Sequence, residues 1–229
     1  VETRWLEECE NMAGGERMDG WNTTFGGPGG GGGRGGGDDE DEFDSDDDDD
    51  AAGESAGVEL SPRATSRIDD RFITRLVTAI VREQRSRGEL SSPSSDGRGR
   101  KNGAVLIFLP GKGEIESLAR AMYDCPPLMR DRSFVRILKL HSSVSPRDQR
   151  QVFLPANPGT IKIVLSTNVA ETSVTIPDVS YVIDAGRVKE SRYNSSTRIR
   201  ELVTVWTSRA SADQRRGRAG RTGPGVCYR

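Results

Sequence analysis

The run AVLIFLP at residues 104–110 decides the fold of this chain. An uninterrupted apolar run is typical of a strand that is buried on both faces of a parallel sheet. A helix is expected at residues 112–124, directly after it. The pattern then repeats, with strands expected at 135–140, 161–166 and 180–184 and a further helix at 146–153. Strands that alternate with helices predict an α/β fold with a doubly wound, mostly parallel sheet, whose ligand sites lie beyond the carboxyl ends of the strands.

A helix is expected before this alternating region. Ser66 and Asp69 have the spacing of a capping box, and the apolar residues that follow recur at helical steps, which predicts a helix at about residues 67–87. The stretch 88–103 is rich in Gly, Ser and Pro and is expected to be a surface loop.

The first part of the chain has a different composition. Residues 1–10 are interpreted as the end of a helix from an upstream element, since Val1 is not a natural start and suggests a fragment. A glycine tract and the acidic run 38–50 follow, so residues 11–65 are expected to form a disordered linker. An alternative is that the acidic run folds back on a basic face of the domain and competes with its ligand.

The charge is distributed very unevenly. Residues 1–57 hold 3 of the 33 Lys and Arg residues and 18 of the 35 Asp and Glu residues, a net charge of −15, which leaves +13 for residues 58–229. A basic domain usually binds a polyanion, most often a nucleic acid. No apolar run approaches the roughly 18 residues that span a bilayer, and no leader is visible, so a soluble protein without a membrane partner is expected.

The cysteine and histidine content excludes several kinds of site. Three scattered cysteines fit a reducing compartment, so the protein is expected to be intracellular, in the cytoplasm, nucleus or mitochondrion. His141 is the only histidine, which leaves no basis for a histidine-based zinc site or a Ser-His-Asp triad; it is expected to form a hydrogen bond within a loop. No metal ligands are predicted in this chain.

Polar or glycine-rich clusters follow each of the four predicted strands: LPGKGE, LHSS, STNVAETS and IDAGR. Small hydroxyl residues and exposed amides at such turns bind phosphate oxygens. Several such turns at one sheet edge would form a track for a nucleic-acid backbone.

The segment QRRGRAGR at residues 214–221 carries the strongest chemical signal. Arg218 and Arg221 are three residues apart and would share one helical face if the helix continues through them. Two guanidinium groups suit the charge that develops on a transferred phosphoryl group, and Gln214 could orient water or phosphate. A plain basic patch or a nuclear-targeting tract is the alternative.

The segments FLPG, LHSS, STNVAETSVTI and QRRGRAGR match, in order and spacing, motifs of the DEAH/RHA group of superfamily 2 RNA helicases. The resemblance covers residues 67–229 and implies a C-terminal RecA-like domain at 66–229, truncated at its C-terminal end. It also implies that residues 187–206 form a β-hairpin near the point of strand separation. The chain has neither the GxxxxGK[ST] motif nor the DExH motif, so this piece alone is expected not to hydrolyse ATP.

The resemblance assigns roles residue by residue. It implies that Gln214, Arg218 and Arg221 are catalytic and face the γ-phosphate of ATP, with the arginines as arginine fingers. It implies nucleotide binding by Thr175, Gly217 and Gly220, although Pro177 stands where many members have Asp. The positions that match RNA-backbone contacts are Gly111, Ser142, Thr167, Asn168, Thr172 and Ser173.

The resemblance therefore implies an ATP-dependent RNA helicase that unwinds RNA in the 3′-to-5′ direction or remodels ribonucleoproteins. The expected partners are RNA, the N-terminal RecA-like domain of the same protein and an activating or ribonucleoprotein component. ATP with Mg²⁺ would be held mainly by that other domain. Two alternatives stay open, a non-catalytic RNA-binding scaffold and a superfamily 2 DNA helicase.

Overall fold

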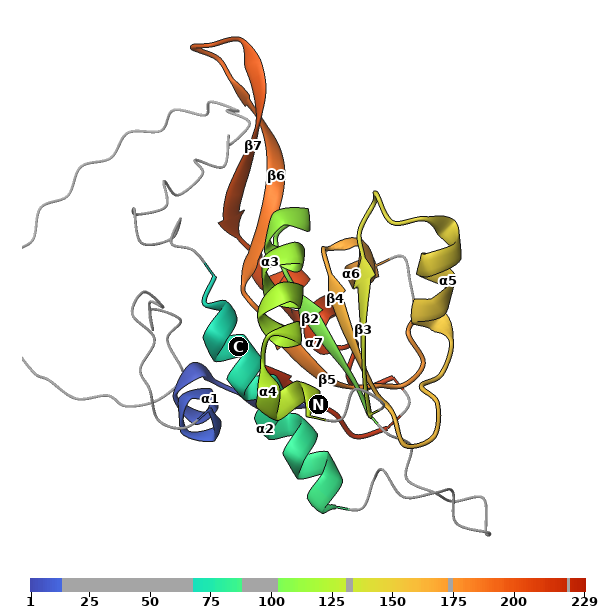
Figure 1. Cartoon of the computed structure of the whole chain (residues 1–229). Coiled ribbons are helices and arrows are strands. Elements are labelled where there is room, and N and C mark those ends of the chain that lie inside the picture. The colour runs from blue at the N-terminus through green and yellow to red at the C-terminus, as the bar shows by residue number, and fades with distance from the viewer. Residues whose placement is uncertain (14–67, 88–102, 131–133, 173–174, 222) are drawn as a thin grey trace, which may run out of the picture.

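The computed structural model describes residues 1–13, 68–87, 103–130, 134–172, 175–221 and 223–229 of the chain (Figure 1). Most of the stretch expected as a disordered linker and most of the expected surface loop lie outside these residues. Within the described part, no helix is both long enough and apolar enough to cross a membrane.

A six-stranded sheet forms the centre of the molecule, in the order β1-β8-β5-β2-β4-β3. Every pair of neighbouring strands in it is parallel. The bounds are β1 Glu2–Arg4, β2 Ala104–Phe108, β3 Val135–Leu140, β4 Ile161–Ser166, β5 Val179–Asp184 and β8 Val226–Tyr228. The predicted parallel α/β sheet is thus confirmed, and each of the four expected strands is present.

Helices cover both faces of the sheet, as the side chains of β2 show. Val105 and Ile107 belong to one apolar cluster, which includes residues of the first four helices. Leu106 and Phe108 point to a second cluster, which includes Val152 of α5. The helices are α1 Leu6–Met12, α2 Asp70–Ser86, α3 Lys112–Tyr123, α4 Pro126–Met129, α5 Pro146–Phe153, α6 Val169–Thr172 and α7 Arg209–Arg216.

The first residues of the chain differ from the expectation of a helix end from an upstream element. Glu2–Arg4 is strand β1 and pairs in parallel with β8, from Glu2 opposite Val226 to Arg4 opposite Tyr228. Cys9 of α1 is 2 % exposed and lies in the same apolar cluster as α2. Residues 2–13 are therefore part of this domain, because β1 forms backbone hydrogen bonds with its sheet and Cys9 packs in its apolar core.

The start of α2 also differs from the prediction. The N-cap is Asp69, whose Oδ1 accepts a hydrogen bond from the Phe72 backbone N–H at 2.9 Å. The predicted cap, Ser66, lies outside the described residues. Asp is among the best N-cap residues because its carboxylate satisfies an otherwise unpaired N–H group of the first turn.

Replacing Asp69 by alanine is expected to lower the free energy of unfolding by about 0.5–2 kcal/mol, since the first turn of α2 loses its cap. Urea denaturation followed by circular dichroism measures this loss. Arg71→Ala is the control, because Arg71 is exposed in the same turn. Equal stability of Asp69→Ala and the wild type would contradict the assignment of the cap.

A long antiparallel hairpin projects from the sheet (Figure 1). Strand β6 spans Arg187–Asn194 and β7 spans Ile199–Trp206, paired throughout their length. The predicted hairpin at these residues is confirmed. At its base the Arg187 guanidinium lies 5.0 Å from the centre of the Trp206 ring. The Lys189 ammonium contacts both carboxylate oxygens of Glu114 on α3, at 2.9 and 3.0 Å, which fixes the hairpin against that helix.

A buried ion pair joins β4 to the segment that precedes β5. Lys162 of β4 has a side chain that is 2 % exposed, and its ammonium lies 2.6 Å from Oδ1 of Asp178. It also donates to the carbonyl oxygens of Val152 and Leu154 at 3.0 and 2.8 Å, which anchors the end of α5. A buried lysine needs these partners, because an unpaired buried charge is strongly destabilising.

Candidate phosphate-binding site

The carboxyl ends of four neighbouring strands lie in register. Ser166 of β4 is opposite both Phe108 of β2 and Leu140 of β3, and Phe108 is opposite Asp184 of β5. Backbone hydrogen bonds continue just past the strands, for example from Leu109 N–H to the Ser166 carbonyl at 2.8 Å. The four polar clusters that follow these strands therefore begin at one edge of the sheet, as predicted.

The loop after β4 turns directly into the single turn of α6. Thr167 donates its backbone N–H to the Leu140 carbonyl at 3.2 Å, and Glu171 N–H donates to the Asn168 carbonyl at 2.9 Å. Ala170 is 1 % exposed and anchors the turn in the core, whereas Asn168 and Thr172 are exposed. The expected contacts Thr167, Asn168 and Thr172 are thus presented by one short element. Ser173 lies outside the described residues.

The loop after β2 brings Gly111 under the hairpin. A Cβ atom at Gly111 would lie 2.8 Å from Lys189 Nζ and 3.0 Å from Glu114 Oε2, so the Lys189–Glu114 ion pair occupies the space that a larger residue would need. Gly111 is the N-cap of α3 and has no side chain to cap that helix. A side chain at this position would require the ends of the Lys189 and Glu114 side chains to shift.

The loop after β3 carries Ser142, which is exposed, and His141, which is buried. His141 Nδ1 accepts a hydrogen bond from the Ser143 backbone N–H at 3.2 Å, as expected of a loop residue. Burial first, and then the positive charge of Lys112, lower the pKa of His141. The imidazole is therefore neutral at pH 7 and can accept this hydrogen bond.

The segment 214–221 does not continue as a helix. Helix α7 ends at Arg216 with Gly217 as its C-cap, and turns follow, with Arg218 N–H donating to the Arg215 carbonyl at 3.0 Å. Arg218 and Arg221 therefore do not share a helical face, which was expected only if the helix continued through them. The helix ends at Gly217, a residue of low helix propensity, and Ala219, which is 1 % exposed, then turns into the core beside Gly225.

Both arginines instead contact the chain around α6. Arg221 donates to the hydroxyl of Thr175, and Arg218 donates to the backbone carbonyl of Glu171. Arg221 is exposed, whereas Arg218 is 8 % exposed. Burial first, and then the charge of Arg221, lower the pKa of the Arg218 guanidinium. The structure thus brings Thr175, Arg218 and Arg221 together.

The remaining predicted residues of this segment lie around the two arginines. Gln214 is exposed on the last turns of α7, and Gly217 is exposed directly after it. Gly220 is also exposed, and a Cβ atom there would lie 2.5 Å from Val1 Cγ2. Gly220 therefore lets this segment pass close to the first residue of the chain.

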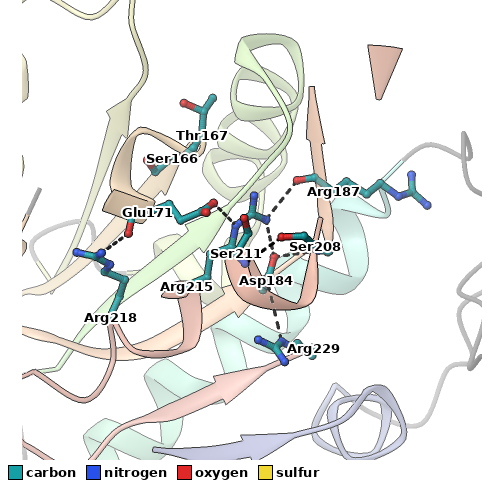
Figure 2. A network of polar contacts seen from close by, with 11 residues as sticks. Ser166, Thr167, Glu171, Asp184, Arg187, Ser208, Ser211, Arg215, Arg218 and Arg229 are labelled. Carbon is teal, nitrogen blue, oxygen red and sulfur yellow. Dashed lines mark hydrogen bonds and ion pairs between the residues drawn. The ribbon is translucent and has the colours of Figure 1, made fainter. Parts of the chain in front are cut away.

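The centre of the polar network is Arg215, which the sequence analysis gave no role (Figure 2). Its side chain is 1 % exposed and forms ion pairs with Asp184 at 2.8 Å and Glu171 at 3.0 Å. It also donates to the Arg187 carbonyl at 3.3 Å, and its guanidinium lies 5.0 Å from the centre of the Phe108 ring. Arg215 therefore joins the loops after β2, β4 and β5 to α7.

One sequence signal could have indicated Arg215. Asp184 ends a strand whose other residues are apolar or small, VSYVI, and its side chain is fully buried. A carboxylate at the end of a buried strand requires a buried cation or several hydrogen bonds. The arginine-rich segment 214–221 is one source of such a cation.

Two solved structures of Escherichia coli proteins are similar to this chain. The E. coli DExH-box NTPase HrpB matches with a TM-score of 0.54 and 34 % identity, over 72 % of this chain and 18 % of that one. A second structure, the Escherichia coli DEAH/RHA helicase HrpB, matches with a TM-score of 0.57 and 32 % identity, over 71 % of this chain and 18 % of that one. The parallel sheet, the hairpin and the arginine segment define a RecA-like domain of the DEAH type.

Residues 90–223 match the family described as "Helicase conserved C-terminal domain". The chain belongs to this family, and it is a C-terminal domain of a DEAH-type superfamily 2 helicase. The resemblance found in the sequence motifs is thereby confirmed.

Curated relatives agree with this assignment. A putative DEAH-box ATP-dependent helicase of Mycosarcoma maydis is 48 % identical over 164 residues, which is 72 % of this chain and 10 % of the relative. The ATP-dependent RNA helicase DHX29 of Homo sapiens is 50 % identical over 131 residues, 56 % of this chain and 9 % of that protein. The chain thus spans about a tenth of the length of these curated relatives.

Proposed function

We propose that this chain is the second motor domain of an ATP-dependent RNA helicase, which unwinds RNA in the 3′-to-5′ direction or remodels ribonucleoproteins. The observation that carries the proposal is the contact between two segments at one sheet edge. Arg218 and Arg221 lie against Glu171 and Thr175, on either side of the end of α6. The arginine segment suits a γ-phosphate, and the segment around α6 suits a nucleic-acid backbone.

The phosphate side would act on ATP that is bound mainly by a partner RecA-like domain. When the two domains close, the Arg218 and Arg221 guanidinium groups would neutralise the charge on the γ-phosphoryl group, and Gln214 would orient the attacking water or the phosphate. Thr175, Gly217 and Gly220 would line the nucleotide. Hydrolysis would release the arginines and reopen the domains.

The partner domain would also hold the magnesium ion. Mg²⁺ prefers carboxylate and phosphate oxygens as ligands. At this edge the carboxylates of Asp184 and Glu171 are both paired with Arg215, and the predicted site residues offer guanidinium, hydroxyl and amide donors, which fit phosphate oxygens. The residues present therefore fit a nucleotide and not its metal.

The nucleic-acid side would bind the RNA backbone without reading bases. Thr167 and Asn168 would contact it from the β4–α6 turn, Thr172 from α6, and Ser142 and Gly111 from the adjacent loops, with Ser173 as a further expected contact. Hydroxyl side chains and backbone amides suit phosphate and sugar oxygens, which carry no sequence information. The hairpin β6–β7 would stand next to this track, fixed to α3 by Lys189 and Glu114.

RNA-stimulated ATP hydrolysis tests the proposal. The protein must join this domain to its nucleotide-binding partner domain, and single-stranded RNA and DNA of one sequence are compared. Hydrolysis that RNA stimulates supports the proposal. Stimulation by DNA alone would indicate a superfamily 2 DNA helicase instead, and RNA binding without hydrolysis would favour the RNA-binding scaffold.

A further inference from the structure

Between Arg218 and Arg221 the chain turns inward at Ala219, whose side chain is 1 % exposed. This side chain lies in the same apolar cluster as Ala170 and Ile176. Ala170 directly precedes, and Ile176 directly follows, the residues that accept hydrogen bonds from the two arginines. Ala219 therefore fixes the arginine segment against the part of the core that also holds its acceptors.

Gly225 provides the space that this inward turn needs. A Cβ atom at Gly225 would lie 2.2 Å from the Ala219 carbonyl oxygen and 2.7 Å from the Ala219 Cβ atom. Both distances are far below the roughly 3.5–4.0 Å at which non-bonded carbon atoms pack. Gly225 is not one of the glycines with a positive φ angle, so its backbone conformation is open to other residues. The close approach of Ala219 alone requires a glycine here.

The backbone of Gly225 is held from its other side. Its carbonyl oxygen accepts a hydrogen bond from the Glu2 backbone N–H at 2.9 Å, and the next residue, Val226, pairs with Glu2 of β1 and Tyr181 of β5. Ala219 lies in a turn, whose backbone hydrogen bond to the end of α7 is 3.2 Å long. A strand that is paired on both sides is harder to displace than a turn. An added methyl group at position 225 would therefore move Ala219, and the arginines with it.

We propose that Gly225 and Ala219 are positioning residues for the guanidinium groups of Arg218 and Arg221. Gly225 is buried and acts through Ala219, whose place in the core holds both arginines ready before ATP binds. Charged groups that are already in place stabilise a transition state without the cost of rearrangement. The pairing of β1 with β8 contributes to this arrangement, since it holds Gly225. The inference rests on the proposed function and adds to it the residues that set the geometry of the arginines.

The test measures ATP hydrolysis at saturating RNA, in the protein that contains both motor domains. Gly225→Ala is expected to lower kcat roughly 10²-fold, since a misplacement of about 1 Å can cost that much. The KM for ATP and the affinity for RNA are expected to change little, because a buried residue that acts through the arginines contacts neither ligand. Gly223→Ala is the matched control, since Gly223 is exposed and a Cβ atom there would have no atom within 4 Å. It is expected to keep the wild-type kcat.

A double-mutant cycle separates an effect on the arginines from general damage. In the Arg218→Ala background, Gly225→Ala is expected to lower the remaining turnover less than about threefold, because residues that act as a unit are not additive. The full loss in that background would overturn the inference, since Gly225 would then act independently of the arginine.

Ala219→Gly decides the matter if Gly225→Ala does not fold. It removes the buried side chain and adds no atom, so it is expected to lower kcat less than Gly225→Ala, and again only while Arg218 is present. Wild-type kcat in Ala219→Gly, or in a folded Gly225→Ala, would assign these residues a purely structural role. A loss confined to the KM for ATP would also contradict the inference, since it would indicate nucleotide binding.

Failure of the proposed function gives a different pattern. Absence of RNA-stimulated hydrolysis in the wild type would refute the proposed function itself, and unchanged turnover in Arg218→Ala would refute the role of the arginine. If RNA stimulates the wild type and Arg218→Ala is slow, full kcat in the variants at positions 219 and 225 refutes only this inference.

Discussion

Replacing Arg218 by alanine is expected to slow ATP hydrolysis by roughly 10³-fold or more in the protein that contains both motor domains, the effect typical of a lost arginine finger. The guanidinium would stabilise charge that exists only in the transition state, so the loss falls on kcat more than on KM. The contact of Arg218 with the Glu171 carbonyl places it at the junction of the two proposed sites.

Steady-state hydrolysis at saturating RNA measures this effect. Arg209→Ala is a matched control, because Arg209 begins helix α7 and is exposed. Its removal is expected to change kcat less than about twofold, which corresponds to a surface substitution of less than about 0.5 kcal/mol. Unchanged turnover in Arg218→Ala would remove this residue from the catalytic site.

Replacing Arg215 by leucine is expected to lower the free energy of unfolding by about 3–5 kcal/mol, the range for breaking a buried ion pair from one side. Asp184 has a fully buried side chain and Glu171 is 8 % exposed, so both carboxylates would lose their closest cation in a place that water reaches poorly. Arg229 remains near Asp184, at 3.9 Å, and offsets only part of the loss.

Urea denaturation of the chain gives this free energy. The adjacent Arg216 provides the control, because its side chain is 43 % exposed and its ion pair with Asp213 has an N–O distance of 3.5 Å. Arg216→Leu is expected to cost less than about 1 kcal/mol, as exposed ion pairs contribute little. Equal losses in the two variants would mean that Arg215 is not the anchor of the network.

The central part of the fold was predictable from the sequence because its signals are local. The strands at residues 135–140 and 161–166 and the helix at 146–153 have the bounds that were expected. An apolar run between turn residues specifies a buried strand without reference to the rest of the chain. The position of the polar clusters was also predictable, because the carboxyl ends of parallel strands all lie at the same edge of the sheet.

The features that the sequence did not reveal depend on distant partners. Strand β1 has only three residues, and nothing in Glu2–Arg4 indicates that Val226–Tyr228 will pair with it. Arg215 looked like one basic residue among several, and only the placement of Asp184 and Glu171 makes it the most enclosed of them.

The pairing of β1 with β8 has a consequence for how the polypeptide folds during synthesis. Strand β1 pairs with β8, which lies more than 220 residues later in the chain. At about 5–20 residues per second, the nascent β1 waits on the order of ten seconds or longer before its neighbour leaves the ribosome. Contacts of such separation form late, so the edge containing β1 is expected to be the last part of the sheet to assemble.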